Sequence, residues 1–192
     1  IDKSLSYFQK FAHRAEGFAA PKGIWNSGFQ GLLEERGFFY SSEFSLDYDN
    51  FPFYPAIAGR FSPVLQIPIH PVCIGLYTAS GIRDSQKIGD YFQEVILAKY
   101  GHNLPVFLYG HPNENLEGKL RIWRAILEKA SSLKNVWRLT FSELAKWWKK
   151  RYGLEVEELS FDMESRSLSY KVRQGCDIKD ISFCIHDTRE RA

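Results

Sequence analysis

The sequence has few cysteines and no long apolar run. Its three cysteines, Cys73, Cys176 and Cys184, are an odd number without metal-ligand spacing. This argues against a disulfide framework and favours a reducing, cytoplasmic compartment. No apolar stretch approaches the roughly 20 residues of a membrane helix, so we expect no membrane contact. The chain starts with Ile1 and its one methionine is Met163, which indicates a processed or partial product.

The charge balance is also unremarkable. Lys plus Arg number 25 against 23 Asp plus Glu, a net charge of +2, and the longest basic stretch is the short segment 146–151. Nucleic-acid binding driven by phosphate neutralisation requires a stronger basic footprint, so we expect no nucleic-acid partner. At 192 residues and 44% hydrophobic composition, the chain is predicted to fold as one ordinary domain with a small appendage.

Residues 1–152 alternate short apolar runs with amphipathic segments, which is typical of β/α units around a parallel sheet. Helices are predicted at 4–17 (closed by Gly17), 27–36 (capped by Asn26), 84–101 and 141–152. Strands are predicted at 18–21, 38–44, 64–70, 105–110 and 136–139. In strand 64–70, Pro68 indicates an edge position or a bulge.

Two further helical signals lie in this part of the chain. Apolar residues at helical spacing predict one buried stripe on the helix after Pro112, made of Leu116, Leu120, Trp123, Leu127 and Ala130. Thr140 and Glu143 are placed as a capping box for helix 141–152, which should end at Gly153.

After Gly153 the hydrophobic period changes to two. The segments 154–162, 166–173 and 180–186 alternate apolar and polar residues and are joined by short polar turns. We therefore expect two parts, a β/α part at 1–152 and a three-stranded antiparallel β appendage at 153–192.

Polar and aromatic residues collect where the predicted parallel strands end. Ligands in such folds are handled by loops at the carboxyl ends of the strands. These ends carry Pro21 to Trp25, Glu43 to Asp49, His70, Tyr109 with His111, and Thr140. They are the predicted site region.

Five motifs at these ends carry a family resemblance. In order, the segments 17–26 (GFAAPKGIWN), 37–55 (GFFYSSEFSLDYDNFPFYP), 65–72 (LQIPIHPV), 106–112 (VFLYGHP) and 139–148 (LTFSELAKWW) resemble the second half of a polysaccharide deacetylase of the NodB-homology type. The resemblance covers roughly residues 1–152. It implies an α/β fold, part of a (β/α) barrel of the polysaccharide deacetylase type.

The resemblance also implies an activity. Such enzymes remove acetyl groups from carbohydrate polymers with a divalent, zinc-like metal that activates a bound water. A separate histidine, aligned by a carboxylate, protonates the leaving group. His111 matches that histidine, and Asp49 or Asp47 is its candidate partner; the spacing does not decide between them. The resemblance further suggests carbohydrate contacts for Pro21, Trp25, Tyr54, His70 and Tyr109.

The sequence departs from the family pattern in its metal-binding half. The aspartate pair and the spaced histidine pair of the family are absent, and Ala19 stands where an arginine is usual. We therefore expect no metal on this chain alone and no activity without a missing N-terminal segment. Because a half barrel exposes two sheet edges, such a chain should also need that segment or a second copy for solubility.

Each assignment has a structural alternative. His111 is either the acid or a strand-end histidine bonded to a loop, and Asp47 and Asp49 are either partners of the acid or turn formers. For His70, between flanking prolines, a structural or pocket-wall role is favoured. For the whole chain, the alternative function is a non-catalytic carbohydrate-binding or scaffolding module.

Overall fold

The computed structural model describes residues 1–43, 51–111, 116–175 and 179. Contacts divide the chain into two compact units, Ile1–Ser142 and Glu143–Ala192. This boundary precedes most of the last helix, whereas the sequence places it at 152/153. Among the described residues, no helix combines the length and apolar character that crossing a bilayer requires.

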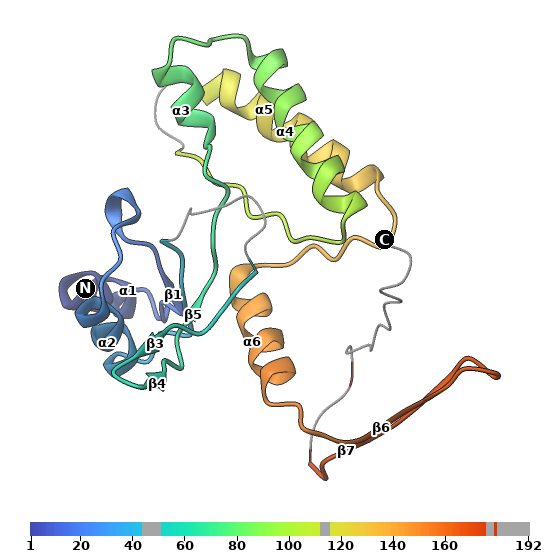
Figure 1. Cartoon of the computed structure of the whole chain (residues 1–192). Helices are drawn as coiled ribbons and strands as arrows, with labels where there is room; N and C mark the ends of the chain where they lie inside the picture. Colours follow the sequence, from blue (N-terminus) through green and yellow to red (C-terminus); the bar gives the residue numbers. More distant parts are fainter. Residues whose placement is uncertain (44–50, 112–115, 176–178, 180–192) are drawn as a thin grey trace. The chain divides into compact units, whose positions relative to one another are not determined.

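The first unit is built on a parallel sheet with strand order β1-β2-β5; β1 and β5 are labelled in Figure 1. β1 (Gly17–Phe18), β2 (Tyr40–Ser41) and β5 (Leu65–Gln66) pair in register. Further backbone bonds extend the ladder, among them Ile67 N–H to the Ser41 carbonyl at 2.9 Å. The predicted α/β class with parallel strands is confirmed. The described residues form an open sheet, and a barrel is not shown.

The strands are shorter than predicted, and in two of them the prediction ran up to or across a proline. Pro21, Pro68 and Pro71 have no N–H to donate to a ladder. Segment 105–110 is no regular strand, although the His70 N–H donates to the Phe107 carbonyl at 2.8 Å. Segment 136–139 also forms no strand, so that prediction was wrong. A small antiparallel pair, β3 (Ala56–Ile57) and β4 (Arg60–Phe61), lies between β2 and β5 in the sequence.

The helices of the first unit have bounds close to most predictions. They are α1 (Asp2–Lys10), the short 3₁₀ turn η1 (Pro21–Gly23), α2 (Ser27–Glu35), α3 (Ile74–Ala79), α4 (Ser85–Gly101) and α5 (Leu116–Ser132). α1 ends well before Gly17, which belongs to β1. The helix stops where Ala12 takes a left-handed φ of 53°. The predicted helix 4–17 was therefore wrong at its carboxyl end.

Two apolar clusters form the core of this unit. One joins α2 to the sheet through Leu33, Phe38 and Val64. The other joins α3, α4 and α5 through buried Ile74, Ile88, Phe92, Ile96, Ile122 and Ile126. The predicted stripe on α5 was wrong for Leu120 and Leu127, which are 57% and 60% exposed, whereas Trp123 packs against this cluster as predicted. α5 has apolar residues on two faces, and the isoleucine face packs against α4.

The second unit contains most of α6 (Phe141–Tyr152) and a hairpin of β6 (Val156–Asp162) and β7 (Ser167–Val172). α6 has the predicted bounds. Cross-strand pairs Leu159–Tyr170 and Phe161–Leu168 share one face of the hairpin, and polar residues share the other. The predicted third strand, 180–186, lies outside the described residues.

Candidate functional site

The loop after β1 lies on the end of β2. It contains η1, in which Lys22 and Gly23 have left-handed φ values of 61° and 63°. The Ala20 N–H donates to Oε1 of Glu43 at 3.1 Å. A Cβ on Gly23 would lie 2.9 Å from the Glu43 carbonyl oxygen. Gly23 is thus required both for the backbone conformation and for the close approach to Glu43.

Replacing Gly23 with alanine should therefore destabilise the protein by about 2 kcal/mol, because the left-handed backbone and the contact with Glu43 both oppose a Cβ. Urea denaturation followed by circular dichroism measures the loss. Gly59→Ala is the matched control: Gly59 has a φ of 82° and no atom within 4 Å of an added Cβ. Equal losses in the two variants would contradict a role for the Glu43 contact.

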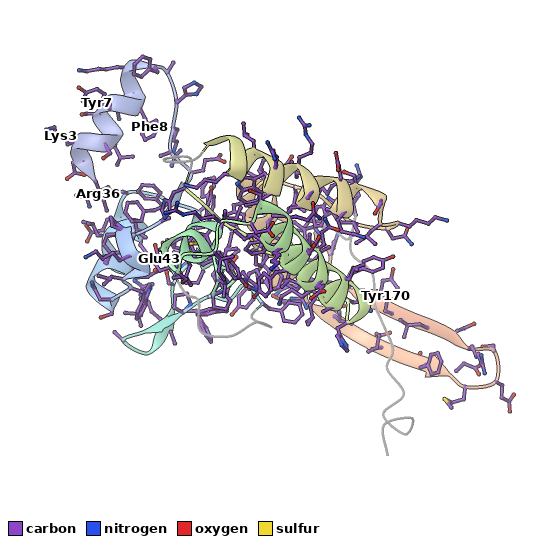
Figure 2. All side chains as sticks on the ribbon, turned by 90° about the horizontal axis from the view of Figure 1, so that it is seen from above. Lys3, Tyr7, Phe8, Arg36, Glu43 and Tyr170 are labelled. Atoms are coloured by element: carbon purple, nitrogen blue, oxygen red, sulfur yellow. The ribbon has the colours of Figure 1, made fainter. Side chains whose placement is uncertain are left out.

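Glu43 is a buried carboxyl group at the carboxyl end of β2, only 3% exposed. By contrast, Tyr7 and Phe8 on α1 are 58% and 48% exposed; all three residues are labelled in Figure 2. The Ser41 hydroxyl donates to the same Oε1 that accepts from the Ala20 N–H. Burial raises the pKa of Glu43, and the hydrogen bonds from Ser41 and the Ala20 amide oppose that rise.

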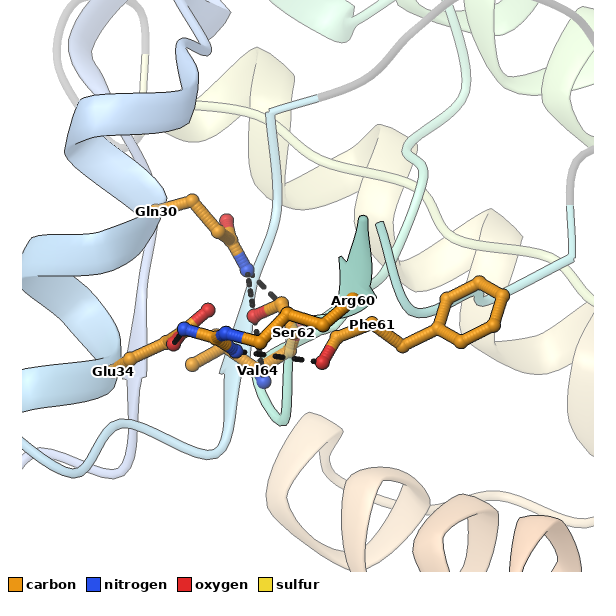
Figure 3. A network of polar contacts seen from close by, with 6 residues as sticks. All are labelled: Gln30, Glu34, Arg60, Phe61, Ser62 and Val64. Atoms are coloured by element: carbon orange, nitrogen blue, oxygen red, sulfur yellow. Dashed lines mark hydrogen bonds and ion pairs between the residues drawn. The ribbon is translucent and has the colours of Figure 1, made fainter. Parts of the chain in front are cut away.

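Two buried glutamines connect this carboxyl to the loop. Oε1 of Gln30 accepts from the Trp25 indole N–H at 3.0 Å and from Nε2 of Gln66 at 2.7 Å. Nε2 of Gln30 donates to the Ser62 hydroxyl and to the Val64 carbonyl, both at 3.0 Å (Figure 3). Both glutamines are 0% exposed. We call Trp25, Gln30, Ser41, Glu43 and Gln66 the Glu43 cluster.

A second carboxyl group, on α2, provides a contrast. Glu34 pairs with Arg60 at 2.5 Å (Figure 3). Burial acts to raise the pKa of Glu34, but hydrogen bonds from Arg60 and Ser62 hold it below its ordinary value. Glu34 therefore has a cation to balance its charge, whereas the groups acting on Glu43 are uncharged.

His111 lies in a separate group with Tyr109 and Cys73. The rings of Tyr109 and His111 meet edge to face with centroids 6.5 Å apart. A Cβ on Gly75 would lie 4.0 Å from Cδ2 of His111, which places the imidazole against the start of α3. Burial and a hydrogen bond with Cys73 raise the pKa of Tyr109 to about 12, so the phenol stays neutral. The His111 side chain is exposed.

His70 is buried, 4% exposed, and its ring meets the rings of Tyr91 and Phe92 at 6.0 Å. Its Nδ1 accepts from the Val72 N–H at 3.1 Å. Burial lowers the pKa of His70, so the ring is a neutral imidazole near pH 7. This is the structural role that the flanking prolines favoured.

The other predicted residues are dispersed. Pro21 is exposed, Trp25 is half-buried and its indole N–H is bound to Gln30, and Tyr54 is half-buried. Asp47 and Asp49 lie outside the described residues. The structure thus brings Trp25 together with Glu43, and Tyr109 together with His111.

Comparison with known sequences adds no relative. No family model and no curated protein matches the chain.

The described residues do not fit a metal ion. Within the described ranges, no three His, Cys, Asp or Glu side chains come together as ligands. His70 is buried and its Nδ1 already has a partner. The arrangement can instead hold a proton at Glu43 and present an imidazole at His111.

Sequence reasoning missed Gln30 and Gln66 as members of the site. Gln66 interrupts the apolar strand 64–70, and a polar side chain in a buried run requires a partner. That interruption was the available signal. Its partner, Gln30, lies on α2 and is identified only by the fold.

Proposed function

We propose that this chain carries the proton-donating histidine of a carbohydrate deacetylase, with His111 as the general acid. The observation that carries the proposal is the placement of His111. Its exposed imidazole follows segment 105–110, edge-on to the neutral Tyr109 and beside the start of α3. The family resemblance of the motifs around it supports the same assignment.

In this role, a protonated His111 donates its proton to the leaving nitrogen or oxygen of an acetylated sugar as the bond to the acetyl carbon breaks. The neutral Tyr109 phenol borders the imidazole without adding a competing charge. Asp47 or Asp49 remains the proposed partner that aligns the ring. Activation of the attacking water requires groups other than those described here.

A binding module is the second candidate. It is favoured by the exposed aromatic rings of Phe51 and Phe53, which are 50% and 38% exposed and can stack on sugar faces. Ala19, in place of the family arginine, favours it as well.

Acetate release separates the candidates. We expect this 192-residue chain with added Zn²⁺ to release no acetate from an acetylated chito-oligosaccharide, because the described residues form no metal site. The native polypeptide, purified from its source, should release it. Release by the 192-residue chain would refute the placement of the metal ligands outside it. Binding of the oligosaccharide by the native polypeptide without release would favour the binding module.

A further inference from the structure

The hairpin of β6 and β7 in the second unit has two unlike sides. Residues that lie opposite each other in antiparallel strands point to the same side of the sheet. On one side of this hairpin, the cross-strand pairs are all apolar or aromatic. They are Val156–Val172, Leu159–Tyr170 and Phe161–Leu168, which we call the hairpin apolar face.

A β-bulge completes this face. The strand register shifts between Val156 and Glu158. Without the shift, Glu157 would lie opposite Val172; with it, Val156 does. The carboxylate of Glu157 instead pairs with Lys171, whose Nζ lies 3.4 Å from its Oε2. The bulge therefore keeps a valine, and not a glutamate, opposite Val172.

The other side of the hairpin carries its charges, and opposite charges are paired there. Nζ of Lys171 lies 3.4 Å from Oε1 of Glu158, and the guanidinium of Arg173 lies 2.6 Å from Glu155. Such exposed pairs add little stability, but their side of the hairpin suits contact with water. The two sides thus have different requirements.

The hairpin apolar face is open to solvent in the single chain. Leu159 is 62% exposed, Tyr170 44% and Phe161 40%. A two-stranded hairpin is at best marginally stable in water by itself. A contiguous exposed apolar surface is typical of an interaction site. This face therefore requires a partner surface.

The sizes of the side chains make the face complementary to itself. Phe161 and Leu168 form the large pair next to the turn, the valines form the small pair at the open end, and Leu159–Tyr170 lies between them. A twofold axis perpendicular to the strands, through the Leu159–Tyr170 pair, would place the large pair of one copy over the small pair of the other. Large residues facing small ones allow two sheets to interdigitate.

The chemistry of the face also favours a second copy. Nucleic acids, lipid headgroups and acidic peptides are bound through charges, and the hairpin apolar face is composed of uncharged residues. Interfaces between identical chains are more apolar than those between different chains. In a twofold dimer, the same surface serves on both copies.

The size of the face predicts the strength of the contact. At about 3.4 Å per residue, the 6 residues of β7 give it a length of about 20 Å, and two strands give it a width of about 10 Å. This is small for a protein–protein interface, so we expect association in the micromolar range.

We propose that two copies of this chain form a dimer by packing their hairpin apolar faces on each other, with Leu159 near the twofold axis. The inference does not depend on the deacetylase proposal, because it concerns the second unit alone.

Leu159→Lys tests the proposal by sedimentation equilibrium of the 192-residue chain. The wild type should convert from monomer to dimer as its concentration rises through the micromolar range. Leu159→Lys should raise the dimer Kd at least about 30-fold, because it brings two ammonium groups together near the axis. Since Leu159 is 62% exposed in the single chain, the variant should keep the wild-type circular dichroism spectrum.

Ser160→Lys is the matched control. It introduces the same residue one position further along β6, on the other side of the hairpin and opposite Ser169. Its dimer Kd should stay within about twofold of the wild type. In the wild type, hydrogen exchange of the β6 and β7 amides should slow as concentration rises, a measurement that needs no variant.

Three results would overturn the proposal. A wild type that stays monomeric throughout the micromolar range would show that the face is covered in another way. A Leu159→Lys variant that dimerises as tightly as the wild type would assign the dimer to a different surface, such as the sheet edges of the first unit. Equal weakening by both lysine variants would show that the effect is not specific to the apolar side.

Discussion

Replacing Phe92 with alanine should lower the free energy of unfolding by about 3–5 kcal/mol. Phe92, on α4, is 1% exposed and belongs to the cluster that joins α3, α4 and α5. Its ring meets those of Tyr91 at 5.1 Å and Tyr77 at 6.1 Å. Removing it leaves a cavity between three helices, a loss comparable to much of the 5–15 kcal/mol stability of a typical domain.

Phe92 also packs against the buried ring of His70, so the substitution removes that contact as well. Leu97→Ala is the matched control, on the same helix and 44% exposed, and should cost less than about 1 kcal/mol. Both variants end in alanine, so helix propensity contributes only the small difference between phenylalanine and leucine to the comparison. Urea denaturation gives both values, and a Phe92→Ala loss no larger than that of Leu97→Ala would contradict the assigned core.

The parts of the fold that the sequence predicted are those fixed by local chemistry. α2 begins as expected because Oδ1 of Asn26 accepts from the Phe29 N–H at 2.7 Å. α4 begins after Asp84, whose side chain caps the Gln86 and Lys87 amides. Such caps bind amides only a few residues away, so they can be predicted without knowledge of the tertiary structure.

The wrong predictions concern features that depend on residues distant in the sequence but close in space. The buried face of α5 depends on which apolar side meets α4, and the isoleucine side does so. The end of α1 depends on the left-handed turn at Ala12, which no residue preference signals. β5 ends at Gln66, two residues before Pro68, which has no N–H for a sheet hydrogen bond, whereas β2 is short without any proline in the predicted strand 38–44.

The candidate site also has a part that the sequence predicted and a part that depends on tertiary packing. Glu43 and His111 were expected near strand ends, since position along the chain is enough for that prediction. The bonds from Gln30 to Trp25 and Gln66 join positions up to 36 residues apart, so they follow only from the packing of α2 on the sheet. Whether Asp47 or Asp49 aligns His111 stays a prediction.

Replacing His111 with alanine should reduce kcat for acetate release by the native polypeptide about 100- to 10,000-fold, with little change in KM. The reason is that a general acid acts as the leaving-group bond breaks, so its loss raises the barrier without weakening substrate binding. Steady-state kinetics with an acetylated chito-oligosaccharide measures both constants.

His102→Ala is the matched control for that variant. His102 follows α4, has an exposed side chain and lies outside the His111 group, so its removal should leave kcat within about twofold of the wild type. With a substrate whose leaving group is less basic, the difference in kcat between His111→Ala and the wild type should be smaller. Such a leaving group needs less protonation to depart. An equal deficit with good and poor leaving groups would assign His111 a positioning role in place of proton donation, and an increase in KM alone would place it in substrate binding.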